Sequence, residues 1–250
     1  MSPPSLGLPE AIEACLFDLD GVLAKTASLH AAAWKATFDP FLRDQAERTR
    51  TRFVPFDPVV DYVEFLDGRT RHDGIRTFLA SRGLRLPEGA PGDGPAHATV
   101  QSLGDAKNAR ALQEVRAHGV EAFAGSVRYV EAVRAAGMRY AVVSASENCD
   151  AVLAAAGIGA LFDVRVDGVV ARRDSLRGKP APDMYLAAAQ ALDVTPAGAA
   201  VFEDALAGVD AARAGGFGYV VGVDRGGRAE RLLTHGADRV VPDLADLIEP

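Results

Sequence analysis

A short apolar run, Ala14 to Phe17, leads into two carboxylates one residue apart, Asp18 and Asp20, and then into Gly21. Such a run is typical of a buried strand, and the glycine favours a turn directly after it. A strand that brings acidic side chains to its carboxyl end builds an oxygen-rich site, which suits Mg²⁺ and phosphate. The segment therefore predicts a buried strand with a candidate active site at its end.

Helices and strands alternate from Ser126 to the end of the chain. The pattern predicts helices over 126–136, 148–156, 182–192 and 205–214, and strands over 138–144, 162–166, 199–202, 219–223 and 239–241. Short apolar strands between amphipathic helices indicate a parallel sheet covered on both faces, whose ligands bind beyond the carboxyl ends of the strands. We therefore expect an α/β protein with a Rossmann-like parallel sheet as its core.

The stretch between the first strand and this alternating part has helical periodicity. Helices are expected over 28–38, 59–66 and 73–81, and the helical pattern continues to residue 115. Pro40, Pro55 and Pro58 are expected to act as breakers. We predict a helical cap, residues 27–112, inserted into a catalytic core of residues 1–26 and 113–250. The Gly/Pro-rich segment 87–95 is predicted to be a mobile loop of the cap, as a connector or as a substrate gate.

The acidic residues at the strand ends suit two kinds of chemistry. Asp18 can attack a phosphoryl group and form an aspartyl-phosphate, while Asp20 can exchange a proton with the leaving or attacking oxygen. Mg²⁺ would be held by Asp18, by the backbone carbonyl of Asp20 and by Asp204, with Glu203 as a ligand or directly behind the ligands. The structural alternatives are solvated turn residues for the first pair and acids that stabilise a helix N-terminus for the second.

Two further residues follow strands or precede helices where a phosphate would lie. The Ser144 hydroxyl could bind a phosphate oxygen together with amides that open the next helix, or it could belong to a helix cap that Ser146 or Asn148 supplies equally well. Lys179 stands between a glycine and a proline just before a predicted helix, which fixes where its ammonium points. A cation in that place suits both a phosphate and the neighbouring carboxylates.

The overall charge excludes some classes of partner. The net charge is −7, from 27 Lys and Arg against 34 Asp and Glu, so the chain has no general attraction for nucleic acid or anionic membranes. Its two cysteines form neither a disulfide framework nor a zinc-binding pattern. Residues 1–10 lack the pattern of a signal peptide, and no stretch is long enough to span a bilayer. We expect a cytoplasmic protein, with a monomer compatible with the sequence.

The motifs taken together resemble the haloacid dehalogenase superfamily of phosphotransferases. The resemblance rests on four segments in the right order, Asp18 to Val22, Ser144, Lys179 to Pro182, and Glu203 with Asp204. It implies that Asp18 is the nucleophile, that Asp20 is the acid/base, and that Ser144 and Lys179 contact the transferring phosphoryl group. It also implies dependence on Mg²⁺.

Within that superfamily the chain is most similar to the β-phosphoglucomutases with a helical cap. Thr26, His30 and Trp34 resemble the segment that leads into their cap, and the segment Gly68 to Arg71 resembles their substrate loop. The resemblance implies that Arg71 holds the distal phosphate and that His30 couples cap closure to the acid/base. The alternative is that His30 and Trp34, four residues apart on a helix, simply pack together.

The segment Ser144 to Asn148 is similar to the second motif of these mutases, which implies substrate binding by Ala145, Ser146 and Asn148. The implied reaction interconverts β-glucose 1-phosphate and glucose 6-phosphate through a bisphosphate, with β-glucose 1,6-bisphosphate as activator and a small phosphorylated sugar as partner. A sugar-phosphate phosphatase on the same scaffold is the nearest alternative. A non-catalytic binding module would be expected to lack an aspartate of the first motif or Lys179, and the chain has all of them.

Three departures from the mutase pattern concern the substrate side. Glu147 stands where a basic residue is common, and Ala205 stands where a serine is common. The stretch 39–61 is longer and richer in charge than expected. These departures put the identity of the sugar in question, and they leave the core chemistry unchanged.

Overall fold

The computed structural model describes residues 5–94 and 97–248. The chain forms two compact units, one of Met1–Lys25 with Val120–Pro250 and one of Thr26–Gly119. The predicted cap, 27–112, ends within helix α3 (Val100–His118), which runs without interruption to Gly119. Residue 95 of the predicted loop lies outside the described residues, as do residues 1–4 of the N-terminal segment without a predicted signal peptide.

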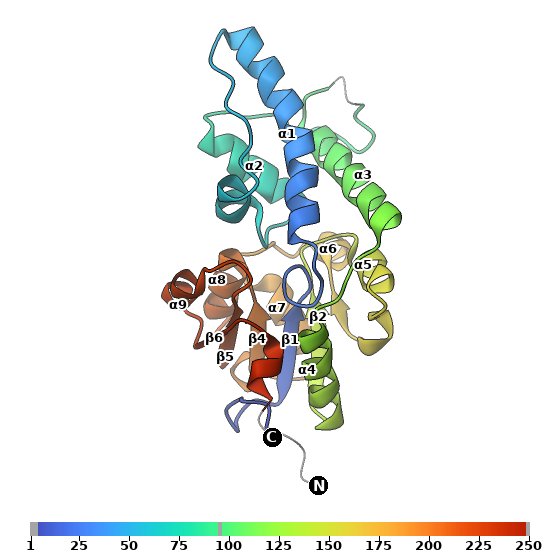
Figure 1. Ribbon diagram of the computed structural model, residues 1–250, viewed down its shortest axis with the longest axis vertical. Coiled ribbons are helices and arrows are strands. Elements are labelled where there is room, and N and C mark those ends of the chain that lie inside the picture. The colour runs from blue at the N-terminus through green and yellow to red at the C-terminus, as the bar shows by residue number, and fades with distance from the viewer. Residues whose placement is uncertain (1–4, 95–96, 249–250) are drawn as a thin grey trace. The chain divides into compact units, whose positions relative to one another are not determined.

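The first unit is built on a parallel sheet of six strands, in agreement with the predicted α/β class (Figure 1). The strands are β1 (Ala14–Asp18), β2 (Arg139–Val143), β3 (Arg165–Val166), β4 (Ala199–Glu203), β5 (Tyr219–Val223) and β6 (Arg239–Val241). Their order is β3-β2-β1-β4-β5-β6. Strands β2 and β3 are added on one side of β1 and strands β4 to β6 on the other, so the strand order reverses beside β1. Asp18 pairs with Val143 on one side, and Phe17 pairs with Phe202 on the other. A reversal of this kind leaves a crevice at the carboxyl ends of the strands.

The helices of this unit connect the strands. They are α4 (Ala124–Ala135), α5 (Cys149–Ala155), α6 (Gly168–Arg173), α7 (Asp183–Ala191), α8 (Leu206–Ala214) and α9 (Ala229–His235), with 3₁₀ turns at Gly159–Leu161, Pro196–Gly198 and Leu244–Leu247. The predictions included neither α6 nor α9. Both are short, and a helix of six or seven residues spans only about two turns, so its periodicity is a weak signal in the sequence.

The two faces of the sheet are packed differently. On one face, Leu16 and Val201 cluster with Ala188 of α7 and Val209 of α8. On the other, the Phe17 ring stacks on Phe202 at 4.6 Å between centroids and meets Tyr129 of α4 edge-on. Because both faces are covered, the strands are apolar throughout, and the polar groups at their carboxyl ends are the places open to chemistry.

The second unit is helical. It contains α1 (Ala27–Thr49), a π-helical turn η1 (Tyr62–Leu66), α2 (Arg71–Ser81) and α3. Its core is aromatic: Phe38 packs against Trp34, Phe56 and Phe78 with ring centroids between 4.3 and 5.6 Å apart. A helical unit within the expected stretch is therefore present in the structure.

The prediction that Pro40 breaks the first helix is wrong, because α1 continues through it to Thr49. A proline inside a helix costs about 3 kcal/mol. The helix continues because Leu42 and Ala46, beyond the proline, follow Phe38 at intervals of four residues and are buried with it. Burial of this apolar stripe offsets the lost backbone hydrogen bond.

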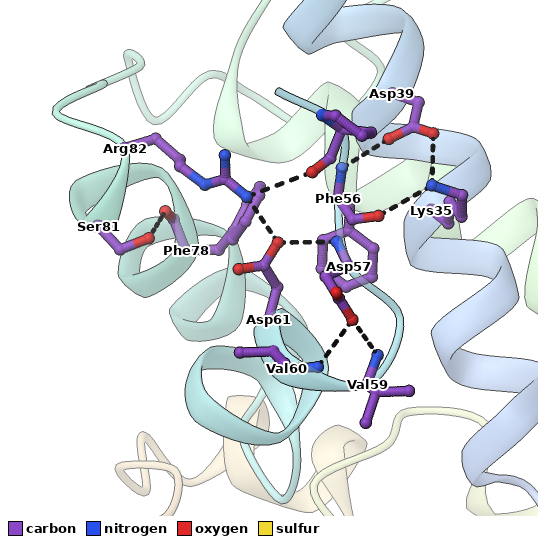
Figure 2. A network of polar contacts seen from close by, with 11 residues as sticks. Lys35, Asp39, Phe56, Asp57, Val59, Val60, Asp61, Phe78, Ser81 and Arg82 are labelled. Carbon is purple, nitrogen blue, oxygen red and sulfur yellow. Dashed lines mark hydrogen bonds and ion pairs between the residues drawn. The ribbon is translucent and has the colours of Figure 1, made fainter. Parts of the chain in front are cut away.

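The charge-rich stretch 39–61 is tied to the helices by a polar network (Figure 2). Asp39 of α1 accepts a hydrogen bond from the Phe56 amide at 2.8 Å, and Lys35 donates to the Phe56 carbonyl at 2.9 Å. Arg82 pairs with Asp61 at 2.6 Å, and Asp61 also accepts from the Asp57 amide. The charged residues of this stretch therefore have a structural use within the cap unit.

The Gly/Pro-rich loop is held at both described ends. Arg76 forms a two-pronged ion pair with Glu88, while Asp93 accepts hydrogen bonds from the Ala90 amide and the Thr99 hydroxyl. Its predicted mobility and gating role stay predictions. Within residues 5–94 and 97–248, no helix is long and apolar enough to cross a membrane.

Candidate active site

The predicted core residues meet at the carboxyl ends of three adjacent strands. Asp18 is the last residue of the central strand β1, and Glu203 is the last residue of β4 beside it. Ser144 directly follows β2 on the other side, and Asp204 follows Glu203. The strand order brings these groups together although Asp18 and Asp204 lie far apart in the sequence.

Lys179 lies between two of these carboxylates with its side chain fully buried. Its Nζ donates to Oδ1 of Asp18 and to Oε1 of Glu203, both at 2.5 Å. Burial alone would lower the pKa of this lysine, but the two carboxylates outweigh burial and raise it, so the ammonium stays charged. Burial raises the pKa of Asp18, and the ammonium of Lys179 opposes that rise. A further cation at the site would favour the ionised Asp18 that a nucleophile requires.

Glu203 is held by three donors. Oε1 accepts from Lys179 and from the Tyr185 hydroxyl at 2.9 Å, and Oε2 accepts from the Ala205 amide at 2.9 Å. A side chain at Gly208 would collide with Glu203, because a Cβ there would lie 1.7 Å from Oε1. Both oxygens of Glu203 are thus engaged, which suits a residue that orders the site from behind its ligands.

The carboxylates of Asp18, Glu203 and Asp204 offer oxygens that lie within 4.8 Å of one another, and all three are buried. Hard oxygen donors in such a cluster fit Mg²⁺. Gly21 allows the first loop to approach, since a Cβ at Gly21 would lie 2.0 Å from Oδ2 of Asp204. The carboxylate of Asp20 is not part of this cluster among the described residues, and the sequence had assigned its backbone carbonyl instead.

Asp20 lies in a closed turn after β1. The Gly21 amide donates to the Ala24 carbonyl at 2.9 Å, and the Leu23 and Ala24 amides both donate to the Leu19 carbonyl. Gly21 has a φ of +89°, a value that L side chains rarely adopt. The turn fixes the backbone on either side of Asp20, which is what a proton-transfer group at the strand end needs.

The loop after β2 orders its own backbone. The Ser144 hydroxyl accepts from the Ser146 amide at 3.1 Å, and the Ser146 hydroxyl accepts from the Asn148 amide at 3.1 Å. Asn148 precedes α5 but makes no side-chain cap. Both serines therefore have a local structural role, and a phosphate role for Ser144, Ala145, Ser146 or Asn148 stays a prediction.

The remaining predicted residues belong to the second unit. Thr26 is buried at the start of α1, and Arg71 is the first residue of α2. The structure brings His30 and Trp34 together through Lys107 of α3, whose Nζ donates to Nδ1 of His30 at 2.9 Å and lies 5.0 Å from the centre of the Trp34 ring.

Sequence analysis missed Lys107 and Tyr185. Lys107 is a single lysine in a long helix, and its burial depends on α1, which lies far away in the sequence. Tyr185 follows the Lys179 segment, and its only signal is a hydroxyl within the otherwise apolar run Met184 to Ala189. Both would have required knowledge of tertiary contacts.

The family model of the haloacid dehalogenase-like hydrolases matches residues 12–216. The chain belongs to this family. Its four motif segments lie within the matched range, and three of their carboxylates form the acidic cluster at the ends of β1 and β4.

Curated relatives in this family include mutases. The chain is 55% identical to a β-phosphoglucomutase of Mycobacterium tuberculosis over 97% of this chain and 94% of that protein. It is 31% identical to a β-phosphoglucomutase of Bacillus subtilis over 94% and 92% of the two chains. The solved structure of CbbY from Rhodobacter sphaeroides in complex with phosphate superposes with a TM-score of 0.69 at 29% identity, over 94% of this chain and 96% of that one.

Proposed function

We propose that the chain is a Mg²⁺-dependent phosphotransferase that interconverts β-glucose 1-phosphate and glucose 6-phosphate. The observation that carries the proposal is the buried ammonium of Lys179 between the carboxylates of Asp18 and Glu203, combined with 55% identity to a β-phosphoglucomutase. The ligand is then a small phosphorylated sugar, and the activator is β-glucose 1,6-bisphosphate. The proposal places the enzyme in the cytoplasm and lets it act as a monomer.

Asp18 is the nucleophile in this proposal. One of its carboxylate oxygens attacks phosphorus, the bond from phosphorus to the sugar oxygen breaks, and an aspartyl-phosphate forms. Lys179 donates a hydrogen bond to the other carboxylate oxygen of Asp18, Oδ1. Its positive charge lies beside the transferring group, where negative charge must be stabilised. Ser144 would donate its hydroxyl to a phosphoryl oxygen.

Asp20 moves the proton. As an acid it protonates the sugar oxygen that leaves phosphorus, and as a base it removes the proton from the sugar hydroxyl that attacks the aspartyl-phosphate. The closed turn at Gly21 keeps this carboxylate near the end of β1. In the conversion of β-glucose 1-phosphate, the aspartyl-phosphate gives its phosphoryl group to the C6 hydroxyl, and Asp18 then takes the phosphoryl group from C1, which restores the aspartyl-phosphate.

Asp18, Asp204 and the Asp20 carbonyl would hold Mg²⁺, whose charge would offset the repulsion between the nucleophile and the phosphate. Glu203 supports the site by fixing Lys179, because both of its oxygens already accept hydrogen bonds. The proposal therefore assigns Glu203 a place behind the ligands.

The cap residues would select the substrate. Arg71 would bind the phosphate that is not transferred. Thr26, His30 and Trp34 would contact the substrate from the segment that leads into the cap. Lys107 holds the ring of His30 and so would set its orientation. On the core side, Ala145, Ser146 and Asn148 would contact the sugar phosphate through the loop after β2.

The test is a product assay with purified protein, Mg²⁺ and β-glucose 1-phosphate. Glucose 6-phosphate should appear, and a low concentration of β-glucose 1,6-bisphosphate should shorten the lag before turnover. Chelation of the metal should stop the reaction, and added Mg²⁺ should restore it. Release of inorganic phosphate as fast as glucose 6-phosphate would instead indicate a phosphatase.

The Asp18→Asn variant is the control for the nucleophile. It should retain the fold, because amide and carboxylate have nearly the same shape, and it should lose phosphoryl transfer. Persistent transfer in this variant would remove Asp18 from the proposed role.

A further inference from the structure

Three consecutive backbone carbonyls of the turn after Asp20 are held by groups outside the turn. Gly21 O accepts from Nε of Arg225 at 3.2 Å. Val22 O accepts from the Ser126 hydroxyl at 2.7 Å, and Leu23 O accepts from the Phe123 amide at 2.9 Å. The turn is therefore anchored along its whole outer edge, beyond the hydrogen bonds that it makes with itself.

Arg225 also contacts the two other residues that hold the turn, Ser126 and Phe123. Besides its bond to Gly21 O, its guanidinium donates from Nη2 to the Ser126 hydroxyl at 3.2 Å, and its Cζ lies over the Phe123 ring at 3.7 Å from the ring centre. Its side chain is 17% exposed, which places a rigid planar cation largely inside the core unit. A single side chain thus links the loop after β5 to the turn that carries Asp20.

The other end of the guanidinium is fixed as well. Nη1 donates to the Pro242 carbonyl at 2.7 Å and to Oδ2 of Asp243 at 3.1 Å. Asp243 is itself held in place. Its Oδ1 accepts a hydrogen bond from the Ala245 amide at the final 3₁₀ turn, and it packs so closely against Gly125 that a Cβ there would lie 1.6 Å from Oδ1. Arg225 is therefore braced between the C-terminal segment and the turn after β1.

We infer that Arg225 is a positioning residue that sets where Asp20 stands relative to the leaving oxygen. The inference rests on the proposed function, in which Asp20 moves the proton. Asp18 depends on other contacts, namely the register of β1 and the ammonium of Lys179. Loss of Arg225 should accordingly impair proton transfer and spare the attack on phosphorus.

The two steps can be separated by the leaving group. When Asp18 attacks β-glucose 1,6-bisphosphate, the bond from phosphorus to the sugar oxygen breaks and that oxygen must take a proton from Asp20. When Asp18 attacks p-nitrophenyl phosphate, the p-nitrophenolate leaves as a stable anion and takes no proton. Efficient general acid catalysis contributes about 10² to 10⁴ in rate, so a displaced Asp20 leaves a large signature on the first substrate alone.

The experiment measures a single turnover of each substrate with enzyme in excess, for wild type and Arg225→Met. The variant should form aspartyl-phosphate from the bisphosphate at least about tenfold more slowly, while p-nitrophenolate release stays within about twofold of wild type. Arg225→Lys keeps the charge but lacks the planar fork, so it should show an intermediate loss. Equal slowing of both substrates would overturn the inference.

Arg213→Met is the matched control. Arg213 is also a partly buried arginine that bonds the Gly236 carbonyl and pairs with Asp238, but it has no recorded contact with the turn after β1. Its loss should lower stability without any dependence on the leaving group. Hydrogen exchange of the peptide spanning 19–24 should increase in Arg225→Met and stay unchanged in Arg213→Met.

Ser126→Ala keeps the inference testable if Arg225→Met does not fold. This change removes one anchor of Val22 O and one partner of Arg225, so it should produce the same leaving-group dependence to a smaller degree. Absence of that dependence in a folded Ser126→Ala would count against the anchoring role. Failure of wild type to phosphorylate Asp18 from either substrate would overturn the proposed function, and the role of Arg225 with it.

Discussion

The hydroxyl of Tyr185 and the ammonium of Lys179 donate to the same oxygen, Oε1 of Glu203, at 2.9 and 2.5 Å. The Lys179 ammonium also lies 4.9 Å from the centre of the Tyr185 ring. Burial and then the carboxylate of Glu203 raise the pKa of Tyr185, so its hydroxyl stays protonated and remains a donor. The tyrosine therefore completes the support of the lysine that pairs with Asp18.

Tyr185→Phe should weaken that support without removing the ring. We expect the free energy of unfolding in urea to fall by about 0.5 to 1.5 kcal/mol, the usual net contribution of one hydrogen bond. Turnover should fall severalfold, because Lys179 and Glu203 lose part of their fixed geometry. Tyr140→Phe is the control, since among the described residues the Tyr140 hydroxyl makes no hydrogen bond. Equal stability of the two variants would contradict the role of Tyr185.

Lys179→Met should be far more damaging. It leaves the carboxylates of Asp18 and Glu203 buried beside each other without their cation, and such a loss costs about 3 to 5 kcal/mol of stability. Urea unfolding should show this loss, and adding Glu203→Gln should recover part of it by removing one of the two charges. Lys25→Met, which breaks an exposed pair with Glu121, should change stability much less. An unfolding midpoint equal to wild type would refute the buried charge cluster.

The core of the site was predictable because each motif follows a strand. Asp18, Ser144 and Glu203 stand at or just after strand ends, and parallel strands bring their carboxyl ends to one edge whatever the intervening sequence. The positions of these strand ends can be predicted from the periodicity of the sequence alone. It does not reach Tyr185, whose role depends on how α7 packs against β4.

The helical cap was less predictable because packing decides its details. Local chemistry argued for a break at Pro40, whereas burial of Leu42 and Ala46 carries α1 through it. The helical pattern over 59–66 forms a π-helical turn, in which the Asp67 amide donates to the Tyr62 carbonyl. In the same way no sequence pattern singles out Arg225, because its partners come from three separate segments.

Arg71→Ala tests the substrate side of the proposal. Loss of a charge-assisted contact with phosphate costs about 1.5 to 3 kcal/mol, so KM for β-glucose 1-phosphate should rise roughly tenfold to a hundredfold. KM for p-nitrophenyl phosphate should stay nearly unchanged, because its one phosphate lies at Asp18. Arg110→Ala, an exposed arginine of α3, is the control. A similar rise for both substrates would argue against a contact with the distal phosphate.

Asp224→Asn tests the loop that carries Arg225. Burial alone would raise the pKa of Asp224, but hydrogen bonds from the amides of Arg228, Gly226 and Ala229 outweigh it and hold the pKa below its usual range. The asparagine variant should lose about 1 kcal/mol of stability at pH 7, because its side-chain NH₂ cannot accept one of the hydrogen bonds that the two oxygens of Asp224 accept. Its single-turnover rates should show the leaving-group dependence of Arg225→Met in weaker form.

The pH dependence of that loss follows from the sign of the shift. A carboxyl with a depressed folded pKa contributes its full stability above the unfolded pKa of about 3.9 and loses it as the pH falls through the folded value. The gap in unfolding free energy between wild type and Asp224→Asn should therefore be constant from pH 7 to about 5 and shrink below about 4. Urea unfolding at several pH values measures the gap, with the exposed Asp163→Asn as control. A gap that widens in acid would show that the loop is not held by the ionised carboxylate.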